Sequence, residues 1–114
     1  MSDKEDAVTK TYALMLWLFP QIGKFPREYR YILGDRIENG LLDILESLIE
    51  ARFVRDKELL LRSTNISLEK MRYLIRMSKD LQFISIKKYE YASKEINQIG
   101  SCVGAWLKKV KKTP

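Results

Sequence analysis

The chain of 114 residues contains no histidine and one cysteine, Cys102. The absence of histidine removes the commonest general base and the commonest zinc ligand, which argues against catalysis and against a zinc centre. A single cysteine cannot form an internal disulfide, so nothing requires an oxidising compartment and we expect a cytoplasmic location. The longest uninterrupted apolar run, residues 13–19, is far shorter than the roughly 20 residues that span a bilayer, so we expect no membrane association.

The sequence also lacks a convincing catalytic constellation. Glu46 and Glu50 share a helical face, but no partner base or metal-binding histidine accompanies them. Cys102 lies beside Val103 among small residues, a setting typical of a buried apolar side chain rather than an activated thiol. Because a glycine-rich phosphate loop is missing as well, we expect a protein that is not an enzyme, with no metal and no cofactor.

Hydrophobic periodicity dominates what is present. Apolar residues recur at alternating steps of three and four, which predicts helices over about 4–23, 27–54, 57–82 and 86–110 within one domain, 1–114. Sustained spacing of this kind favours near-parallel packing, so the predicted fold is all-α, an up-down antiparallel four-helix bundle. The expected core rows are Val8, Tyr12, Met15, Phe19 and Ile22; Gly34, Ile37, Leu41, Ile44, Leu48 and Ala51; Leu61, Thr64, Leu68, Met71, Ile75 and Ser78; and Tyr89, Ala92, Ile96, Ile99, Val103, Trp106 and Val110.

Local signals mark the helix ends and one weak point. Ser2 with Glu5 forms a capping-box pattern, and Ser85 is suited to cap the last helix. The polar stretch 62–65 could break the third helix near Asn65, because Ser, Thr and Asn compete for backbone hydrogen bonds. We favour a continuous helix there. Trp17 and Trp106 are interpreted as core or interface anchors.

Two patterns leave alternatives open. Leu42, Leu45 and Ile49 form a second apolar row on the second helix, which is then covered either centrally within the bundle or by another subunit. Gly100 and Gly104 form a strip of small residues on the last helix. The strip fits close packing within one bundle or contact between subunits.

Basic residues exceed acidic ones by 21 to 15, giving a net charge of +6 that would attract polyanions. Arg72, Arg76 and Lys79 fall on one line at the edge of the packed face, either as a solvated flank paired with Glu69 or Asp80 or as phosphate contacts. The C-terminal lysines fit either a solvated helix end or an electrostatic tether for nucleic acid. The candidate nucleic-acid-binding residues are Arg72, Arg76, Lys79, Lys108, Lys109, Lys111 and Lys112.

Several short segments, in their order and spacing, carry a family resemblance. They are Phe25-Pro26-Arg27, Leu33-Gly34-Asp35-Arg36-Ile37, Met71-Arg72-Tyr73-Leu74-Ile75-Arg76, Lys79-Asp80-Leu81 and Ile99-Gly100 to Trp106-Leu107. By these segments the chain resembles the accessory variability determinant (Avd) family of diversity-generating retroelements. With the turn at 56–58, it is also similar to the wider four-helix proteins encoded in intervening sequences of 23S ribosomal RNA genes.

The Avd resemblance implies a homopentameric barrel of four-helix bundles that binds RNA or DNA and the reverse transcriptase of its element. Such a protein assists synthesis of mutagenised complementary DNA without performing chemistry. By this resemblance Arg72 and Arg76 match basic family positions, with Lys79 the third candidate. The alternative is an oligomeric structural or interaction protein of the ribosomal intervening-sequence type, with no direct role on nucleic acid.

Overall fold

The computed structural model describes residues 3–111, with side chains described from residue 6 onward. Over this range the chain is helical and contains no strand, which confirms the prediction of a four-helix bundle. The four long helices are α1 (Asp3–Ile22), α3 (Asp35–Ala51), α4 (Glu58–Asp80) and α5 (Ile86–Lys111). Two short segments, α2 (Arg27–Tyr29) and η1 (Arg30–Gly34), lead directly into α3. The capping pattern that begins at Ser2 lies outside the described residues.

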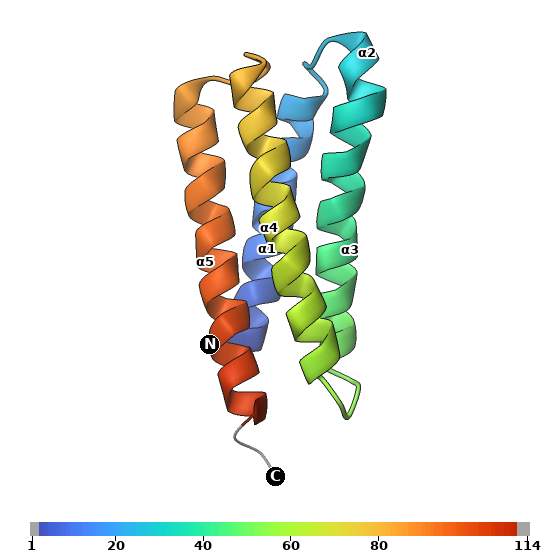
Figure 1. Cartoon of the computed structure of the whole chain (residues 1–114), viewed down its shortest axis with the longest axis vertical. Coiled ribbons are helices and arrows are strands. Elements are labelled where there is room, and N and C mark those ends of the chain that lie inside the picture. Colours follow the sequence, from blue (N-terminus) through green and yellow to red (C-terminus); the bar gives the residue numbers. More distant parts are fainter. Residues whose placement is uncertain (1–2, 112–114) are drawn as a thin grey trace.

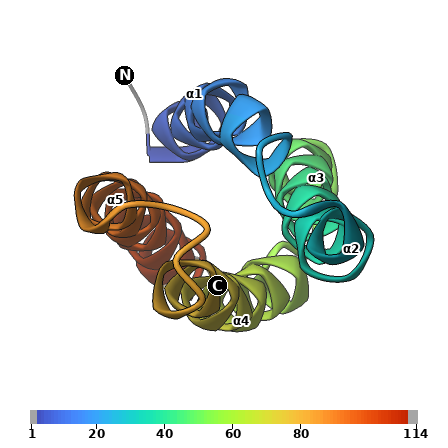
Figure 2. The same ribbon diagram turned by 90° about the horizontal axis from the view of Figure 1, so that it is seen from above.

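The helices stand side by side in an up-down arrangement (Figure 1). Seen along the bundle, they follow one another around a ring in the order α1, α3, α4, α5, and α5 packs back against α1 (Figure 2). The bundle is long and narrow, 49 × 23 × 20 Å. The α1–α2 and α4–α5 connections lie at one end, which we call the loop end, and α5 finishes at the opposite end (Figure 1).

The rows predicted for α3, α4 and α5 form the core, but the row predicted for α1 is rotated. Tyr12 is 55% exposed, whereas Ala7 and Thr11 are fully buried. The uninterrupted apolar run 13–19 gives hydrophobicity no preferred side, so packing decides the rotation. Small side chains at Ala7 and Thr11 face the core, and the Thr11 hydroxyl donates to the carbonyl oxygen of Ala7 at 2.7 Å. The α1 side of the core comprises Ala7, Thr11, Leu14, Met15, Leu18 and Ile22.

The second predicted helix contains a π-helical turn and ends at Ala51, three residues before its expected end. Within η1, the Asp35 backbone N–H donates to the carbonyl oxygen of Arg30, five residues back. A Cβ on Gly34 would lie 2.7 Å from Cγ2 of Ile22, so glycine allows α1 to approach the backbone here. The wider turn shifts the side chains before Gly34 relative to those after it, and Tyr31 and Ile32 project into solvent.

Helix α4 is continuous through Asn65 because its polar residues are satisfied within the helix. Buried Thr64 donates its hydroxyl to the carbonyl oxygen of Leu60, and Ser78 does the same to Leu74. After α4, Gln82 adopts a left-handed conformation with φ of 65°, which reverses the chain toward α5. The Ser85 hydroxyl then accepts the Lys88 backbone N–H, so the predicted cap is confirmed.

Within one chain, the two glycines of the α5 strip have different surroundings. A Cβ on Gly100 would lie 3.0 Å from the Arg72 guanidinium. At Gly104 a Cβ would meet no described atom within 4 Å. Trp106 is buried and Trp17 packs partly buried against the core, as expected for anchoring aromatics. No helix of the described chain is both long and apolar enough to cross a membrane.

Candidate nucleic-acid interface

Arg72, Arg76 and Lys79 lie along the edge of α4 that faces α5. Arg72 donates from Nε to Oδ1 of Asn97 at 3.1 Å. The Lys79 ammonium lies 4.8 Å from the centre of the Tyr89 ring. Because Asn97 and Tyr89 belong to α5, the cations of this row, the α4 edge, follow the seam between the two helices.

Each cation of the α4 edge has an acidic partner in the same helix. Arg72 Nη1 is 2.9 Å from Oε2 of Glu69. Asp80 serves two cations, with Oδ1 at 3.0 Å from Lys79 Nζ and Oδ2 at 3.7 Å from Arg76 Nε. These pairs are partly exposed and individually weak, so an incoming phosphate could replace the carboxylates at little cost. Without a bound polyanion, the α4 edge presents two carboxylates beside its three cations, and their negative charge reduces its attraction for polyanions.

The C-terminal lysines form a separate group. Lys108, Lys109 and Lys111 are exposed in the last turn of α5, where positive charge favourably meets the helix dipole. Lys112 lies outside the described residues. Asn97, which contacts the α4 edge, precedes Lys108 by about 16 Å of helix axis. The structure therefore does not bring the two predicted basic groups together.

A third basic group, which sequence analysis did not single out, gathers at the loop end. Its residues flank the two chain reversals that meet there (Figure 1). In the sequence, Lys24, Arg27 and Arg30 recur every third residue around the 25–27 turn, and this spacing could have indicated the group. The loop-end cations are Lys24, Arg27, Arg30, Lys87 and Lys88.

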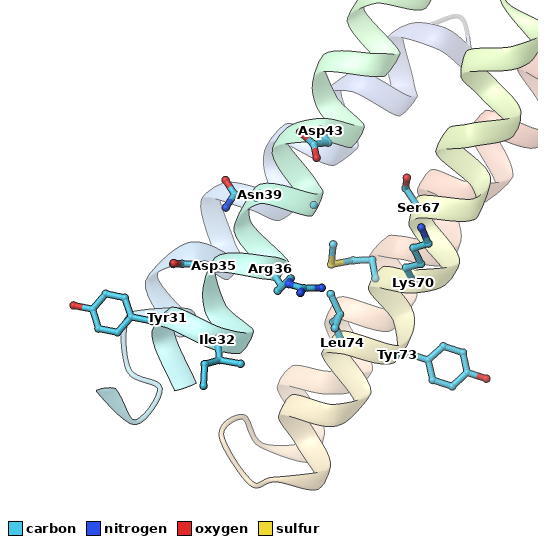
Figure 3. Close-up of a pocket in the computed structure, with 12 residues that line it drawn as sticks. Tyr31, Ile32, Asp35, Arg36, Asn39, Asp43, Ser67, Lys70, Tyr73 and Leu74 are labelled. Carbon is cyan, nitrogen blue, oxygen red and sulfur yellow. The ribbon is translucent and has the colours of Figure 1, made fainter. Parts of the chain in front are cut away.

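A groove of about 660 Å³ separates η1 and α3 from α4 (Figure 3). Arg36 points into it, whereas Tyr31 and Tyr73 point away on opposite sides (Figure 3). The groove narrows at Gly40, where a Cβ would overlap the terminal methyl of Met71. Its rim carries acidic and basic side chains in equal number, so it lacks the positive charge that a polyanion requires. The charged residues are Asp35, Arg36, Asp43 and Lys70.

Glu38 is an acidic residue whose surroundings shift its pKa. Burial raises the pKa of the Glu38 carboxyl, and the neighbouring charge of Asp35 raises it further. Glu38 lies with Asp35 and Arg30 beside a small cavity of about 200 Å³. Within residues 3–111 no three histidine, cysteine, aspartate or glutamate side chains are grouped so that they could hold a metal ion.

Apolar side chains on the outside of α4 form one line, the outer row. Leu59, Ile66 and Tyr73 follow each other at steps of seven, and each is at least 60% exposed. The core residues Leu61, Leu68 and Ile75 lie two positions further along, about 200° around the helix. The outer row therefore points directly away from the core, where no part of the described chain covers it. Met77, half exposed, extends the line toward the loop end.

A second exposed apolar surface lies over α1 and α3. Trp17 marks the side of α1 that faces α5, since its ring centre is 4.6 Å from that of Tyr91. At about 100° per residue, Tyr12 and Leu16 fall on the flank of α1 turned toward α3. The second row of α3 lies on the flank turned toward α1. Leu42 and Ile49 are each 38% exposed, whereas Leu45 is partly buried against the core. This α1/α3 patch comprises Tyr12, Leu16, Leu42, Ile49 and Phe53.

Comparison with known families agrees with this architecture. Residues 7–110 match the model of the bAvd-like family, a span that contains α3 and α4 and nearly all of α1 and α5. The chain therefore belongs to the bAvd-like family, and the Avd resemblance identified from its motifs is confirmed. No curated protein matches the chain.

Proposed function

We propose that this protein is the non-catalytic accessory protein of a diversity-generating retroelement. In this role it binds RNA or DNA without sequence preference in the cytoplasm and associates with the reverse transcriptase of the same element. Its contribution is to support synthesis of mutagenised complementary DNA. The observation that carries the proposal is the family match, which covers residues 7–110.

Self-association into a homopentamer forms part of the proposal. The outer row of α4 and the α1/α3 patch are two different apolar surfaces on two different sides of the bundle. When such surfaces pair between neighbours the contact is heterologous, and copies joined this way close into a ring if the rotation permits. Exposed apolar side chains that adjoin one another on one side of a protein are typical of an interaction surface. The second row of α3 thereby acquires a role as a subunit contact.

Nucleic-acid binding is supported by charge. Each chain carries a net charge of +6, so five copies carry a formal +30, which counterions and internal ion pairs reduce. Several contacts on one ring strengthen binding through avidity without any base-specific contact. Phosphate contacts of this kind predict affinity that falls steadily as salt is added. By family resemblance the first candidates remain Arg72, Arg76 and Lys79, followed by the C-terminal lysines.

One observation favours the alternative of an oligomeric structural protein without a nucleic-acid role. Each cation of the α4 edge already has an acidic partner within the chain. Under this alternative the cations of the α4 edge stabilise α4 and its packing against α5. The apolar surfaces then account for the whole function.

The two functions are separated by titrating a labelled mixed-sequence oligonucleotide with the purified protein at several salt concentrations. The accessory role predicts salt-sensitive binding of both RNA and DNA, and co-purification with the reverse transcriptase of the same element. Reversing charge with the Arg72→Glu, Arg76→Glu double variant should weaken nucleic-acid binding while assembly persists. Unchanged affinity at low salt would exclude the α4 edge as a site. Absence of any nucleic-acid binding by the wild-type chain would leave the structural alternative.

A further inference from the structure

The loop end combines exposed cations with an exposed aromatic ring on one helical surface. Arg27, Arg30 and Tyr31 lie within about one turn of the segment that begins at the Pro26 turn, Arg27 in α2 and the other two in η1. Arg30 and Tyr31 line the same small cavity. All three are exposed, and Tyr31 is 68% exposed, among the least covered aromatic side chains of the described chain. Lys24 adds a further exposed cation just before the turn.

The cations of this surface are less neutralised than those of the α4 edge. Among the described residues, ion pairs are made by Arg62, Arg72, Arg76 and Lys79, and none is made by Arg27 or Arg30. Glu28 is the one acid between them in sequence. Asp35 and Glu38 line a small cavity with Arg30 and Tyr31, but neither carboxylate lies within ion-pair distance of Arg30.

Aromatic packing fixes the base of this surface. The Phe83 ring lies 4.9 Å from Tyr29 and 5.3 Å from Phe25, measured between ring centres. Phe83 belongs to the α4–α5 connection, so these contacts join that connection to α2 and to the connection before it. Across the loop end, Lys88 donates from Nζ to Oε1 of Gln21 at 2.7 Å, which ties α5 to α1. The exposed side chains thus stand on a rigid platform, which lowers the ordering cost of binding.

We propose that the loop end is a binding platform for single-stranded nucleic acid, in which a base stacks on Tyr31 while Arg27 and Arg30 contact the flanking phosphates. This proposal rests on the proposed function, because it assigns a site to the nucleic acid handled there. A cationic surface with an exposed ring is the combination by which proteins bind single strands without reading sequence. Duplex DNA keeps its bases stacked internally, so it can use the arginines but not the ring.

The experiment measures fluorescence anisotropy of labelled oligo-dT, oligo-U and a DNA duplex with the assembled full-length protein across a salt series. The Arg27→Gln, Arg30→Gln double variant is compared with Arg55→Gln, Lys70→Gln. The second pair removes the same charge from exposed positions outside the loop end, the α4 edge and the C-terminal lysines. We expect the loop-end pair to weaken single-strand binding about ten-fold and to flatten the log–log salt dependence by about 1.4 for two lost phosphate contacts. The control pair should change both quantities much less.

Stacking is tested by Tyr31→Ala against Tyr31→Phe. The alanine variant should weaken binding of both single strands about ten-fold, whereas phenylalanine, which keeps the ring, should restore it. Duplex binding should change little in either variant. Circular dichroism and the elution volume establish that each variant is folded and assembled before binding is compared.

Several results would overturn the platform while leaving the accessory function standing. They are an equal loss in the loop-end and control pairs, a loss confined to Arg72→Gln, Arg76→Gln, or an equal effect of Tyr31→Ala on duplex and single strand. A wild-type protein that binds no oligonucleotide at low salt would instead remove the nucleic-acid role itself. The two failures are therefore distinguishable.

Discussion

Replacing Ile66 by glutamate should separate assembly from folding. Ile66 lies in the middle of the outer row and is 60% exposed in the single chain. Full burial of an isoleucine side chain contributes about 1.5–3 kcal/mol, so covering the exposed part in a subunit contact contributes about 1–2 kcal/mol. A carboxylate in that contact adds an uncompensated desolvation cost. We therefore expect the dissociation constant of each contact to rise at least about ten-fold.

The same substitution should barely affect the isolated bundle, because an exposed site away from caps and core changes stability by no more than about 0.5 kcal/mol. Light scattering after size exclusion, over a dilution series, measures the assembly, and urea unfolding measures stability. Ser101→Glu is the matched control, since it introduces the same charge at an exposed position on α5. Assembly of Ile66→Glu at the wild-type concentration would refute the assignment of the outer row as a subunit contact. Loss of folded protein would show that Ile66 acts within the bundle.

Two further predictions concern stability. Gly34→Ala should lower the free energy of unfolding by about 1–3 kcal/mol, because its Cβ would lie 2.7 Å from Cγ2 of buried Ile22. The matched Gly104→Ala, which meets no described atom within 4 Å, should raise it by up to about 1 kcal/mol, and urea titration compares the two. Burial and the Asp35 charge raise the pKa of Glu38 in the folded state, so its contribution to stability falls as pH rises through that pKa. Glu38→Gln should therefore raise the melting temperature at pH 7 but not below about pH 4, where the carboxyl is protonated in both states; an equal shift at both pH values would contradict this.

Periodicity identified most of the fold because the rows at steps of three and four in α3, α4 and α5 coincide with the buried side chains, although α3 and α4 also carry exposed apolar rows. In α5 the predicted core residues share one side of the helix, and the structure buries Ala92, Ile96, Ile99, Val103 and Trp106. In α1 the run 13–19 supports several rotations, and the sequence favoured the one containing Tyr12. The π-turn in η1 was also missed, because residues 27–54 were predicted as one continuous helix.

Binding residues are harder to predict than helices, because sequence gives the position of a charge but not its partners. The spacing of Arg72, Arg76 and Lys79 correctly placed them on one edge, yet the same spacing leaves Asp80 within reach of two of them. Arg27 and Arg30 carry the same charge without an ion pair among the described residues, and their places at the start of the predicted helix 27–54 did not indicate this. A cation free of internal partners offers a phosphate its full charge, whereas a paired one must first give up its carboxylate. The α4 edge and the loop end therefore differ in how far internal carboxylates neutralise their cations. A comparison of the affinities of their glutamine variants therefore decides which surface contributes more to binding the strand.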